Sequence, residues 1–309
     1  MLHRMTYEGH PDTGRSTPEH LRRCLDYLVE NNYTFISLEQ LVLALKNHQT
    51  LPRKAVAFTM DDGYIDQAEI AAPIFLEYNC PLTFFVITGM LDQSIWPWDA
   101  QVSWIVETTE KQSLVTEIAG KPLTFKLHDK ENRRIARRAI QDIIKEKNAE
   151  LLPQIIEQLV RDAELTLPAH APSAHKPMDW DMARKLENQG IRFGPHSVTH
   201  HILSRLSKDP LEQEINSSWK TMEKELKNPL KLFCYPSGRD IDFGTREIIA
   251  LENAGFLGAV STIPRFVEQG QHQNNQLFNL PRLALPDSMD DFIQCCTWIE
   301  YAKSARKLR

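Results

Sequence analysis

Two short stretches of the chain combine residue types that can carry out hydrolytic chemistry. In the first, the adjacent carboxylates Asp61 and Asp62 follow an apolar run and precede Gly63. Adjacent acids at a strand end repel each other, and a divalent cation relieves this by binding one carboxylate and leaving the other free as a base. The same residues also suit a plain strand-to-helix turn, in which Asp caps the helix and Gly supplies the turn. Asp-Asp-Gly alone leaves both interpretations open.

The second stretch contains His196 and His200, which follow Gly194 and Pro195. Two histidines four residues apart on one helical turn present their imidazoles on the same face and can bind one ion. His201 points about 100° away on such a turn and is the weaker candidate. One carboxylate with two histidines leaves coordination positions open for water and a substrate oxygen. The two stretches together therefore indicate a catalytic rather than a structural metal site.

Short apolar or β-branched runs alternate with amphipathic segments along most of the chain. We expect strands at residues 34–37, 55–59, 83–87, 191–193, 231–235, 258–261 and 283–285. We expect helices at residues 18–31, 65–78, 179–189, 210–226 and 245–254. This alternation predicts an α/β fold with a largely parallel sheet, open or closed into a barrel. Both candidate clusters then lie at the carboxyl ends of strands, where α/β proteins bind ligands.

One region interrupts this alternation. Residues 98–170 are charged and helix-like, notably at 130–147, with little strand pattern. We expect a helical insertion here, within a single catalytic domain spanning residues 1–309. The charge run at 132–138 is typical of a solvated helix face.

Composition excludes several classes of protein. The 309 residues are 42% hydrophobic and 25% charged, as in soluble globular proteins. Lys+Arg 36 against Asp+Glu 41 gives no basic excess for nucleic acid or an anionic membrane. The sequence shows neither a membrane-spanning run nor a signal-peptide pattern, so we expect a cytoplasmic protein. The five scattered cysteines are typical of reduced packing residues rather than of disulfides or a CxxC zinc site.

Taken together, the motifs resemble those of the polysaccharide deacetylase family (NodB-homology domain, carbohydrate esterase family 4). Thr59-Met60-Asp61-Asp62-Gly63 is similar to the family's Thr-Phe-Asp-Asp-Gly motif, and residues 196–200 are similar to its His-Ser/Thr-x-x-His motif. Shorter segments agree in the family's order, at residues 2–4, 73–75, 81–85, 235–238 and 281–283. The resemblance implies a distorted (β/α) barrel, a divalent metal, and removal of N-acetyl groups from an amino sugar in a polysaccharide or glycan precursor.

The resemblance also implies roles for individual residues. Asp62, His196 and His200 would hold the metal, for which we expect zinc, and Asp61 would be the general base. The metal and a backbone N–H near Ser237 would stabilise the oxyanion. Tyr235, in the same segment, is a further candidate for contact with the substrate.

The sequence departs from the family pattern at two functional positions. Cys234 stands where the third motif often has an arginine that orients the base, and Arg282 is our candidate to replace it. The late Leu-x-His that supplies the general acid in many members is missing, since no histidine follows His272. His3 is our first choice for the acid, although it equally fits a structural residue near the terminus.

Two alternative functions remain open on the sequence. The metal site does not recognise the sugar, so the substrate could be another linear C–N amide. A catalytically silent sugar-binding protein on the same fold is the second alternative, which the missing acid and arginine make conceivable. The tryptophans Trp96, Trp98, Trp104 and Trp180 could stack on sugar rings, although aromatic residues more often pack in a core.

Overall fold

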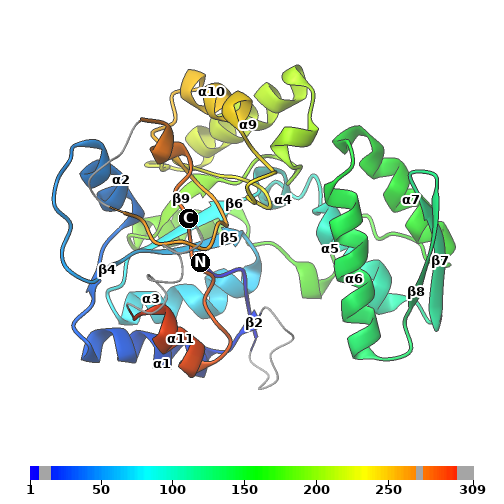
Figure 1. The fold of residues 1–309 in the computed structure, drawn as a ribbon, viewed down its shortest axis with the longest axis horizontal. Coiled ribbons are helices and arrows are strands. Elements are labelled where there is room, and N and C mark those ends of the chain that lie inside the picture. The colour runs from blue at the N-terminus through cyan, green and yellow to red at the C-terminus, as the bar shows by residue number, and fades with distance from the viewer. Residues whose placement is uncertain (7–14, 269–273, 298–309) are drawn as a thin grey trace, which may run out of the picture.

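Short strands lie at the centre of the protein, and helices pack on both sides of them (Figure 1). The computed structural model describes residues 1–6, 15–268 and 274–297, and the structural statements below refer to these residues. A separate group of helices and strands lies beside this central body, on the right in Figure 1. The central body carries the candidate site.

The main sheet consists of three parallel strands. β5 (Phe58–Asp62) pairs with β6 (Leu82–Val86), which pairs with β9 (Arg192–Pro195). Every residue of β5 and β6 is buried, as expected for parallel strands that helices cover on the outside. Their apolar, β-branched and aromatic residues favour this buried strand conformation.

Further segments extend the sheet around a ring. The Leu230 N–H donates to the Phe193 carbonyl at 2.7 Å, which joins β9 to the residues before β10 (Phe233–Cys234). β10 pairs in parallel with β11 (Ala259–Val260). The order β5–β6–β9 therefore continues through β10 to β11.

Residues 280–285 and the first residues of the chain close the ring. Leu280 forms a parallel bridge with β11, and the Leu285 N–H donates to the Met1 carbonyl at 2.9 Å. The Leu2 N–H in turn donates to a carbonyl of β5 at 2.9 Å. The ring is a distorted (β/α) barrel, which confirms the predicted fold class.

The helices of the central body begin at residues that stabilise helix starts. The Thr17 side chain accepts from the His20 N–H at the start of the first helix, with Pro18 at the first position. Ser37 and Gln40 form a capping box at the start of the second. The helices are α1 (Pro18–Glu30), α2 (Leu38–Lys46), α3 (Ala72–Glu77), α4 (Thr88–Leu91), α8 (Trp180–Asn188), α9 (Lys208–Glu225), α10 (Thr245–Asn253) and α11 (Met289–Cys295).

Two short parallel pairs lie outside the ring. They are β1 (Arg4–Met5) with β2 (Arg15–Ser16), and β3 (Thr34–Phe35) with β4 (Ala55–Val56). Apolar side chains of the strands, α1 and α3 form one buried cluster, which includes Met60, Phe75 and Phe84. None of the helices in the described part of the chain is long and apolar enough to cross a membrane.

Most predicted elements are present, with differences at particular segments. The structure has strands within six of the seven predicted segments and helices within all five. Among the described residues, 283–285 are not assigned as a strand, although they hydrogen-bond with Met1. The segment 65–78 begins as a π-helical turn (Gln67–Ala71) before α3.

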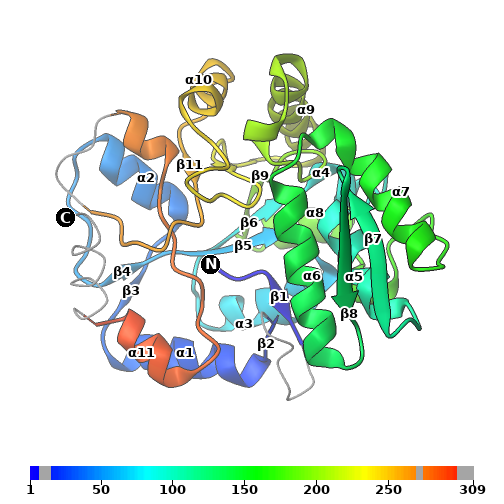
Figure 2. The same ribbon diagram turned by 45° about the vertical axis from the view of Figure 1, so that its right-hand side comes forward.

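The insertion contains both helices and strands. It comprises α5 (Trp98–Thr108), the antiparallel hairpin β7 (Ser113–Ile118) and β8 (Lys121–Lys126), α6 (Lys130–Lys145) and α7 (Leu152–Asp162). Their apolar side chains form a separate buried cluster, which includes Val102, Ile140 and Leu159. Figure 2 shows α6 and the hairpin on the side of the molecule that comes forward in that view. The hairpin differs from the expectation of helices alone.

Candidate active site

Asp61 and Arg282 form a buried ion pair inside the barrel. Both Asp61 oxygens accept hydrogen bonds from the Arg282 guanidinium at 2.7 Å, and the two residues are 1% and 8% exposed. Arg282 also donates to the Ser261 carbonyl at 2.8 Å and to the Thr59 hydroxyl at 2.9 Å. Burial raises the pKa of Asp61, but the charge and hydrogen bonds of Arg282 outweigh it and hold that pKa well below its usual range. Asp61 is therefore anionic and fixed in orientation.

The backbone turns sharply at Asp62, the last residue of β5. Successive residues of a regular strand point to opposite faces, which would separate the two carboxylates. Asp62 has a φ of 85° and Gly63 a φ of 94°, both in the left-handed region. A Cβ atom on Gly63 would lie 2.8 Å from Leu91 Cδ1, so only glycine fits there without displacement. This turn is what directs the Asp62 carboxylate to the histidines beyond β9.

Asp62, His196 and His200 converge at the carboxyl ends of β5 and β9. Asp62 Oδ1 lies 3.5 Å from His196 Nε2 and 3.6 Å from His200 Nε2, and the imidazole centroids are 4.9 Å apart. The other ring nitrogens are engaged, since His196 Nδ1 contacts the Cys234 carbonyl at 2.8 Å and His200 Nδ1 contacts Asp99 Oδ1 at 3.1 Å. With Nδ1 as the donor in each ring, both Nε2 lone pairs face the Asp62 carboxylate.

A loop, not a helical turn, brings the two histidines together. The prediction of a helical turn at residues 196–200 is wrong, because Ser197 and His200 have left-handed φ values of 63° and 62°. The Ser197 hydroxyl accepts from the His200 N–H at 3.0 Å. Glu214 of α9 accepts from two backbone N–H groups of the loop, at 2.8 and 3.0 Å, and from the Thr199 hydroxyl at 2.6 Å. Side-chain bonds therefore replace helical bonds in fixing the loop.

The donor set of this cluster fits a divalent cation. Asp62 Oδ1 is buried and has no hydrogen-bond partner among the described residues. The ligand atoms of Asp62, His196 and His200 lie within 4.8 Å of one another. An orphaned carboxylate oxygen facing two imidazole nitrogens is costly without a positive charge between them. One carboxylate oxygen and two imidazoles are ordinary ligands of zinc.

Burial and the charges of neighbouring side chains shift the pKa values of Asp62, His196 and His200. Burial raises the pKa of Asp62. Burial and the neighbouring His200 lower the pKa of His196 to about 3. Burial acts to lower the pKa of His200 as well, but Asp99 and Asp62 raise it to about 9. In the absence of a cation, a proton on His200 would supply the missing positive charge.

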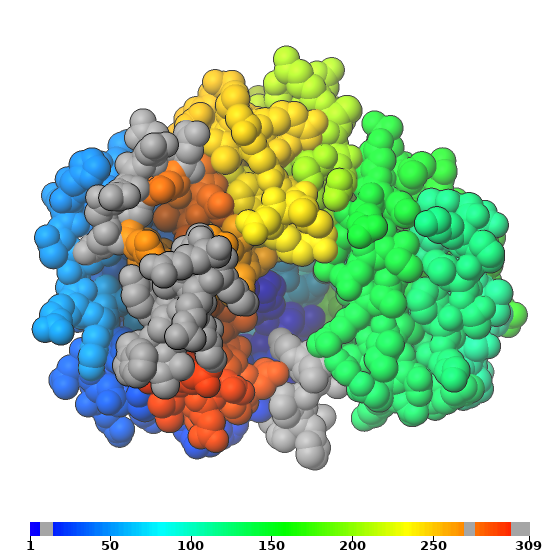
Figure 3. All heavy atoms as spheres, viewed as in Figure 1, coloured from blue at the N-terminus to red at the C-terminus, as the bar shows by residue number. Residues whose placement is uncertain are grey.

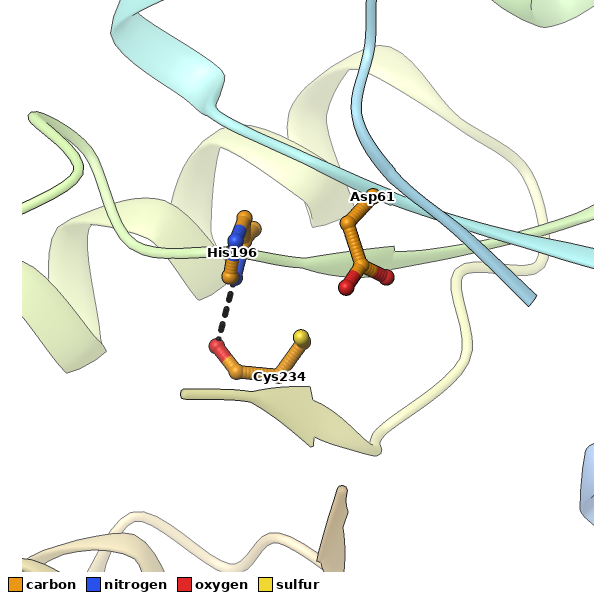
Figure 4. Close-up of side chains that lie close together, drawn as sticks. All are labelled: Asp61, His196 and Cys234. Carbon is orange, nitrogen blue, oxygen red and sulfur yellow. Dashed lines mark hydrogen bonds between the residues drawn. The ribbon is translucent and has the colours of Figure 1, made fainter. Parts of the chain in front are cut away.

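Asp61, His196 and Cys234 form a second cluster that could hold a metal by distance alone. Figure 4 shows the three side chains together, with the hydrogen bond from His196 to the Cys234 carbonyl. Arg282 already supplies a cation here, since its guanidinium lies 3.2 Å from the Cys234 sulfur as well as against Asp61. A metal ion in that place would be repelled by the guanidinium. Of the two clusters, Asp62, His196 and His200 are therefore the better fit to a cation.

The remaining predicted residues differ in what they contact. His3 Nε2 lies 3.6 Å from Asp61 Oδ2, and its side chain is 42% exposed. Ser237, with a φ of 63°, lies in the loop after β10. The buried Tyr235 uses both of its hydrogen-bond donors within the fold, because its hydroxyl donates to the Phe278 carbonyl at 3.0 Å and its N–H donates to the Val260 carbonyl at 3.2 Å.

Sequence reasoning missed two residues that contact the histidine loop. Asp99 lies in the first turn of α5 and Glu214 in the middle of α9, and neither belongs to a recognisable motif. The tryptophans expected either in the core or at a sugar are mostly in the core, since Trp96, Trp98 and Trp180 are all buried.

The surface is hollowed between the barrel and the insertion. Figure 3 shows this hollow between the loop after β10 (yellow) and the insertion (green), with the first residues of the chain (dark blue) at its floor. His3 belongs to those first residues, and the carboxyl ends of β5 and β6 point toward the insertion in Figure 1. Acidic and imidazole groups gathered at this rim of a (β/α) barrel are typical of a hydrolase.

The comparisons with known proteins define the family. The sequence profile described as polysaccharide deacetylase matches residues 48–256, and the chain belongs to this family. Membership in a deacetylase family supports a hydrolase that acts on carbon–nitrogen bonds other than peptide bonds. A search of curated proteins gave no match.

Solved structures with the same fold include several deacetylases. The Streptococcus pyogenes deacetylase PplD in complex with acetate has a TM-score of 0.63 and 18% identity, over 96% of each chain. The de-N-acetylase from Aggregatibacter actinomycetemcomitans has a TM-score of 0.57 and 16% identity, over 96% of this chain and 97% of the other. IcaB from Ammonifex degensii has a TM-score of 0.58 and 13% identity, over 97% and 94%. At these identities the likeness establishes the fold.

Proposed function

We propose that this protein is a metal-dependent deacetylase that hydrolyses the N-acetyl group of an amino sugar, in a polysaccharide or a glycan precursor. The observation that carries the proposal is the orphaned Asp62 oxygen facing His196 and His200, next to the Asp61–Arg282 pair. Family membership and the deacetylases among the similar structures support the reaction type. The proposed substrate class follows from the family.

Asp62, His196 and His200 would hold the ion, for which we propose zinc. When bound, such an ion supplies Lewis acidity at the acetyl carbonyl oxygen and lowers the pKa of water to about 7. The Asp62 carboxylate supplies negative charge and the two neutral imidazoles supply lone pairs. Together they can keep a divalent cation in a buried site. The Ser237 N–H is our proposed donor to the oxyanion.

The remaining chemistry is a proton transfer through the chain's own side chains. Asp61, oriented by Arg282, accepts a proton from the attacking water as the carbon–oxygen bond forms. Because Arg282 disfavours a protonated Asp61, we propose that the proton passes on to His3, whose Nε2 lies 3.6 Å from Asp61 Oδ2. Imidazole exchanges protons near neutral pH and can protonate the leaving nitrogen as the C–N bond breaks. The amine and acetate are then the products.

A cytoplasmic location is part of this proposal. Cys24, Cys80 and Cys234 are buried and form no disulfide, which suits a reducing compartment. We propose an N-acetylated amino sugar as the binding partner, with no nucleic acid partner and no membrane span.

The experiment combines metal analysis with assays of acetate release. Purified wild type, His200→Ala and His201→Ala are compared by elemental analysis and on a panel of N-acetylated amino sugars and simple acetamides. His201 is the matched control, because it is the adjacent histidine and lies outside the cluster. We expect stoichiometric metal and turnover in wild type and His201→Ala, and neither in His200→Ala.

Each alternative gives a different result in the same experiment. Stoichiometric metal in His200→Ala would contradict the ligand assignment. Turnover of simple acetamides but of no sugar would indicate another C–N amide as substrate. A silent sugar-binding protein would release no acetate and would keep its sugar affinity after chelation.

A further inference from the structure

Asp99 is a carboxylate of the insertion that contacts the metal-binding cluster of the barrel. Its Oδ1 lies 3.1 Å from His200 Nδ1, and its side chain is 28% exposed. The opposite nitrogen of the same imidazole faces Asp62 at 3.6 Å. The His200 ring therefore lies between two carboxylates, one from β5 and one from the first turn of α5.

We propose that Asp99 is a positioning residue for His200, and that the insertion completes the metal site by supplying it. The inference rests on the proposed function, because it assigns Asp99 a role toward the ion that His200 would hold. The insertion then contributes a residue to the metal site, in addition to forming one wall of the hollow.

The chemistry of metal-bound histidine explains why this contact matters. A histidine that binds a metal through Nε2 donates its Nδ1–H to an acceptor, which fixes the tautomer and the ring orientation. A carboxylate acceptor also makes the ligating nitrogen more basic than a neutral acceptor does. His196 donates to a neutral carbonyl, that of Cys234, whereas His200 donates to the charged Asp99. His200 is therefore the imidazole whose affinity for a cation depends most on its partner.

The insertion holds Asp99 in place through its backbone. The Asp99 carbonyl accepts hydrogen bonds from Ser103 Oγ at 2.8 Å and from Gln141 Nε2 of α6 at 2.9 Å. The preceding residue reinforces the contact, because Trp98 Nε1 donates to the His200 carbonyl at 3.1 Å. The insertion thus contacts both the ring and the backbone of His200, a residue whose left-handed φ needs support from its surroundings.

Three variants test the inference. Asp99→Ala removes both the acceptor and the charge, whereas Asp99→Asn retains an acceptor oxygen and the size of the side chain. Glu107→Gln is the matched control, because it neutralises a carboxylate of the same helix whose partner is Arg137, at 3.2 Å. The measurements are Zn²⁺ affinity by competition with a chromophoric chelator, the visible spectrum of the Co²⁺-substituted protein, and kcat and KM.

We expect Asp99→Ala to lower the Zn²⁺ affinity by about 10–100-fold, the effect typical of removing such a partner. Asp99→Asn should give a smaller loss, and Glu107→Gln should leave the affinity unchanged. The Co²⁺ bands should shift in Asp99→Ala, because the imidazole is no longer fixed in orientation. The kcat of the Co²⁺ and Zn²⁺ proteins should fall with little change in KM.

Failure of the inference and failure of the proposed function give different results. Tight Zn²⁺ binding by wild type, with the same affinity and Co²⁺ spectrum in both Asp99 variants, would overturn the positioning role and leave the function intact. A wild type that binds neither Zn²⁺ nor Co²⁺ would overturn the proposed function, and the inference with it. If Asp99→Ala fails to fold, the Asp99→Asn affinity and spectrum decide the question.

Discussion

Replacing Arg282 by methionine removes the cation that neutralises Asp61 inside the barrel. Methionine fills a similar space and adapts to irregular gaps, so the principal change is the loss of the guanidinium's positive charge. Removing one partner of a buried ion pair costs about 3–5 kcal/mol, because the other charge is left uncompensated. The two 2.7 Å hydrogen bonds and the near-complete burial of both side chains place Arg282→Met within that range.

The assay is urea unfolding of wild type, Arg282→Met, Asp61→Asn and the double variant. The double variant should recover much of the loss, because a neutral amide is cheaper to bury than a carboxylate. The coupling between the two positions follows from the double-mutant cycle. Arg22→Met is the matched control, since Arg22 also binds Glu77 with two nitrogens but at the surface, where water screens the pair.

The pH dependence gives a second readout of the same variant. The pair lowers the pKa of Asp61 from 3.8, so its stabilisation is present above that pH and is lost as the pH falls. In Arg282→Met the guanidinium no longer offsets burial, which raises the Asp61 pKa, and only the weaker effects of His3 and His196 still lower it. The variant therefore gains stability relative to wild type as the pH falls. The reasoning is refuted by a loss no larger than that of Arg22→Met, or by a difference that does not change with pH.

Three further predictions concern single side chains. Asp61→Asn should keep its metal and lose activity by about 100-fold or more, as expected for loss of a general base, whereas loss of metal would make Asp61 a ligand. His3→Ala should slow hydrolysis of an amide far more than that of an acetate ester, whose leaving group depends less on a proton. Equal losses of rate on the two substrates would show that His3 has only a packing role. Burial lowers the pKa of His175 from 6.5 to about 4, so only the unfolded chain takes up a proton in that interval. Stability should therefore fall by up to about 3 kcal/mol as the pH drops through it, and His175→Gln should flatten this slope in pH-dependent unfolding; an unchanged slope would show that other groups cause it.

The sequence predicted the parts of the site that lie in contiguous motifs. Asp61 and Asp62 are the last two residues of β5, His196 directly follows β9 and His200 lies in the loop beyond it. Parallel strands bring their carboxyl ends to one rim. The contact of Arg282 with Asp61 also followed from the motif, because Cys234 left the expected position without a cation. The backbone at His200 did not follow, since a helical turn and this loop both bring residues four apart together.

The missed features depend on contacts between distant segments. Asp99 contacts His200 across 101 positions of sequence. An acidic residue in the first turn of a helix is ordinarily explained by its favourable interaction with the helix dipole, so Asp99 gave no signal of a role at the site. The hairpin of the insertion was missed because its pattern is atypical of a half-buried strand. Val115 is 64% exposed while the polar Thr116 is buried, which obscures the alternation expected of β7.

The closure of the barrel has a consequence for how the molecule acquires its site. Asp61 and Arg282 are 221 positions apart, and the bond between Leu285 and Met1 joins the two sides of the same seam. During synthesis, the early strands and their helices can form local contacts long before Arg282 leaves the ribosome. Until then the Asp61 carboxylate lacks its cation, and burying it is unfavourable. We therefore expect the interior to desolvate only once the last segment of the ring is in place, so that folding and assembly of the site finish in the same late, long-range step.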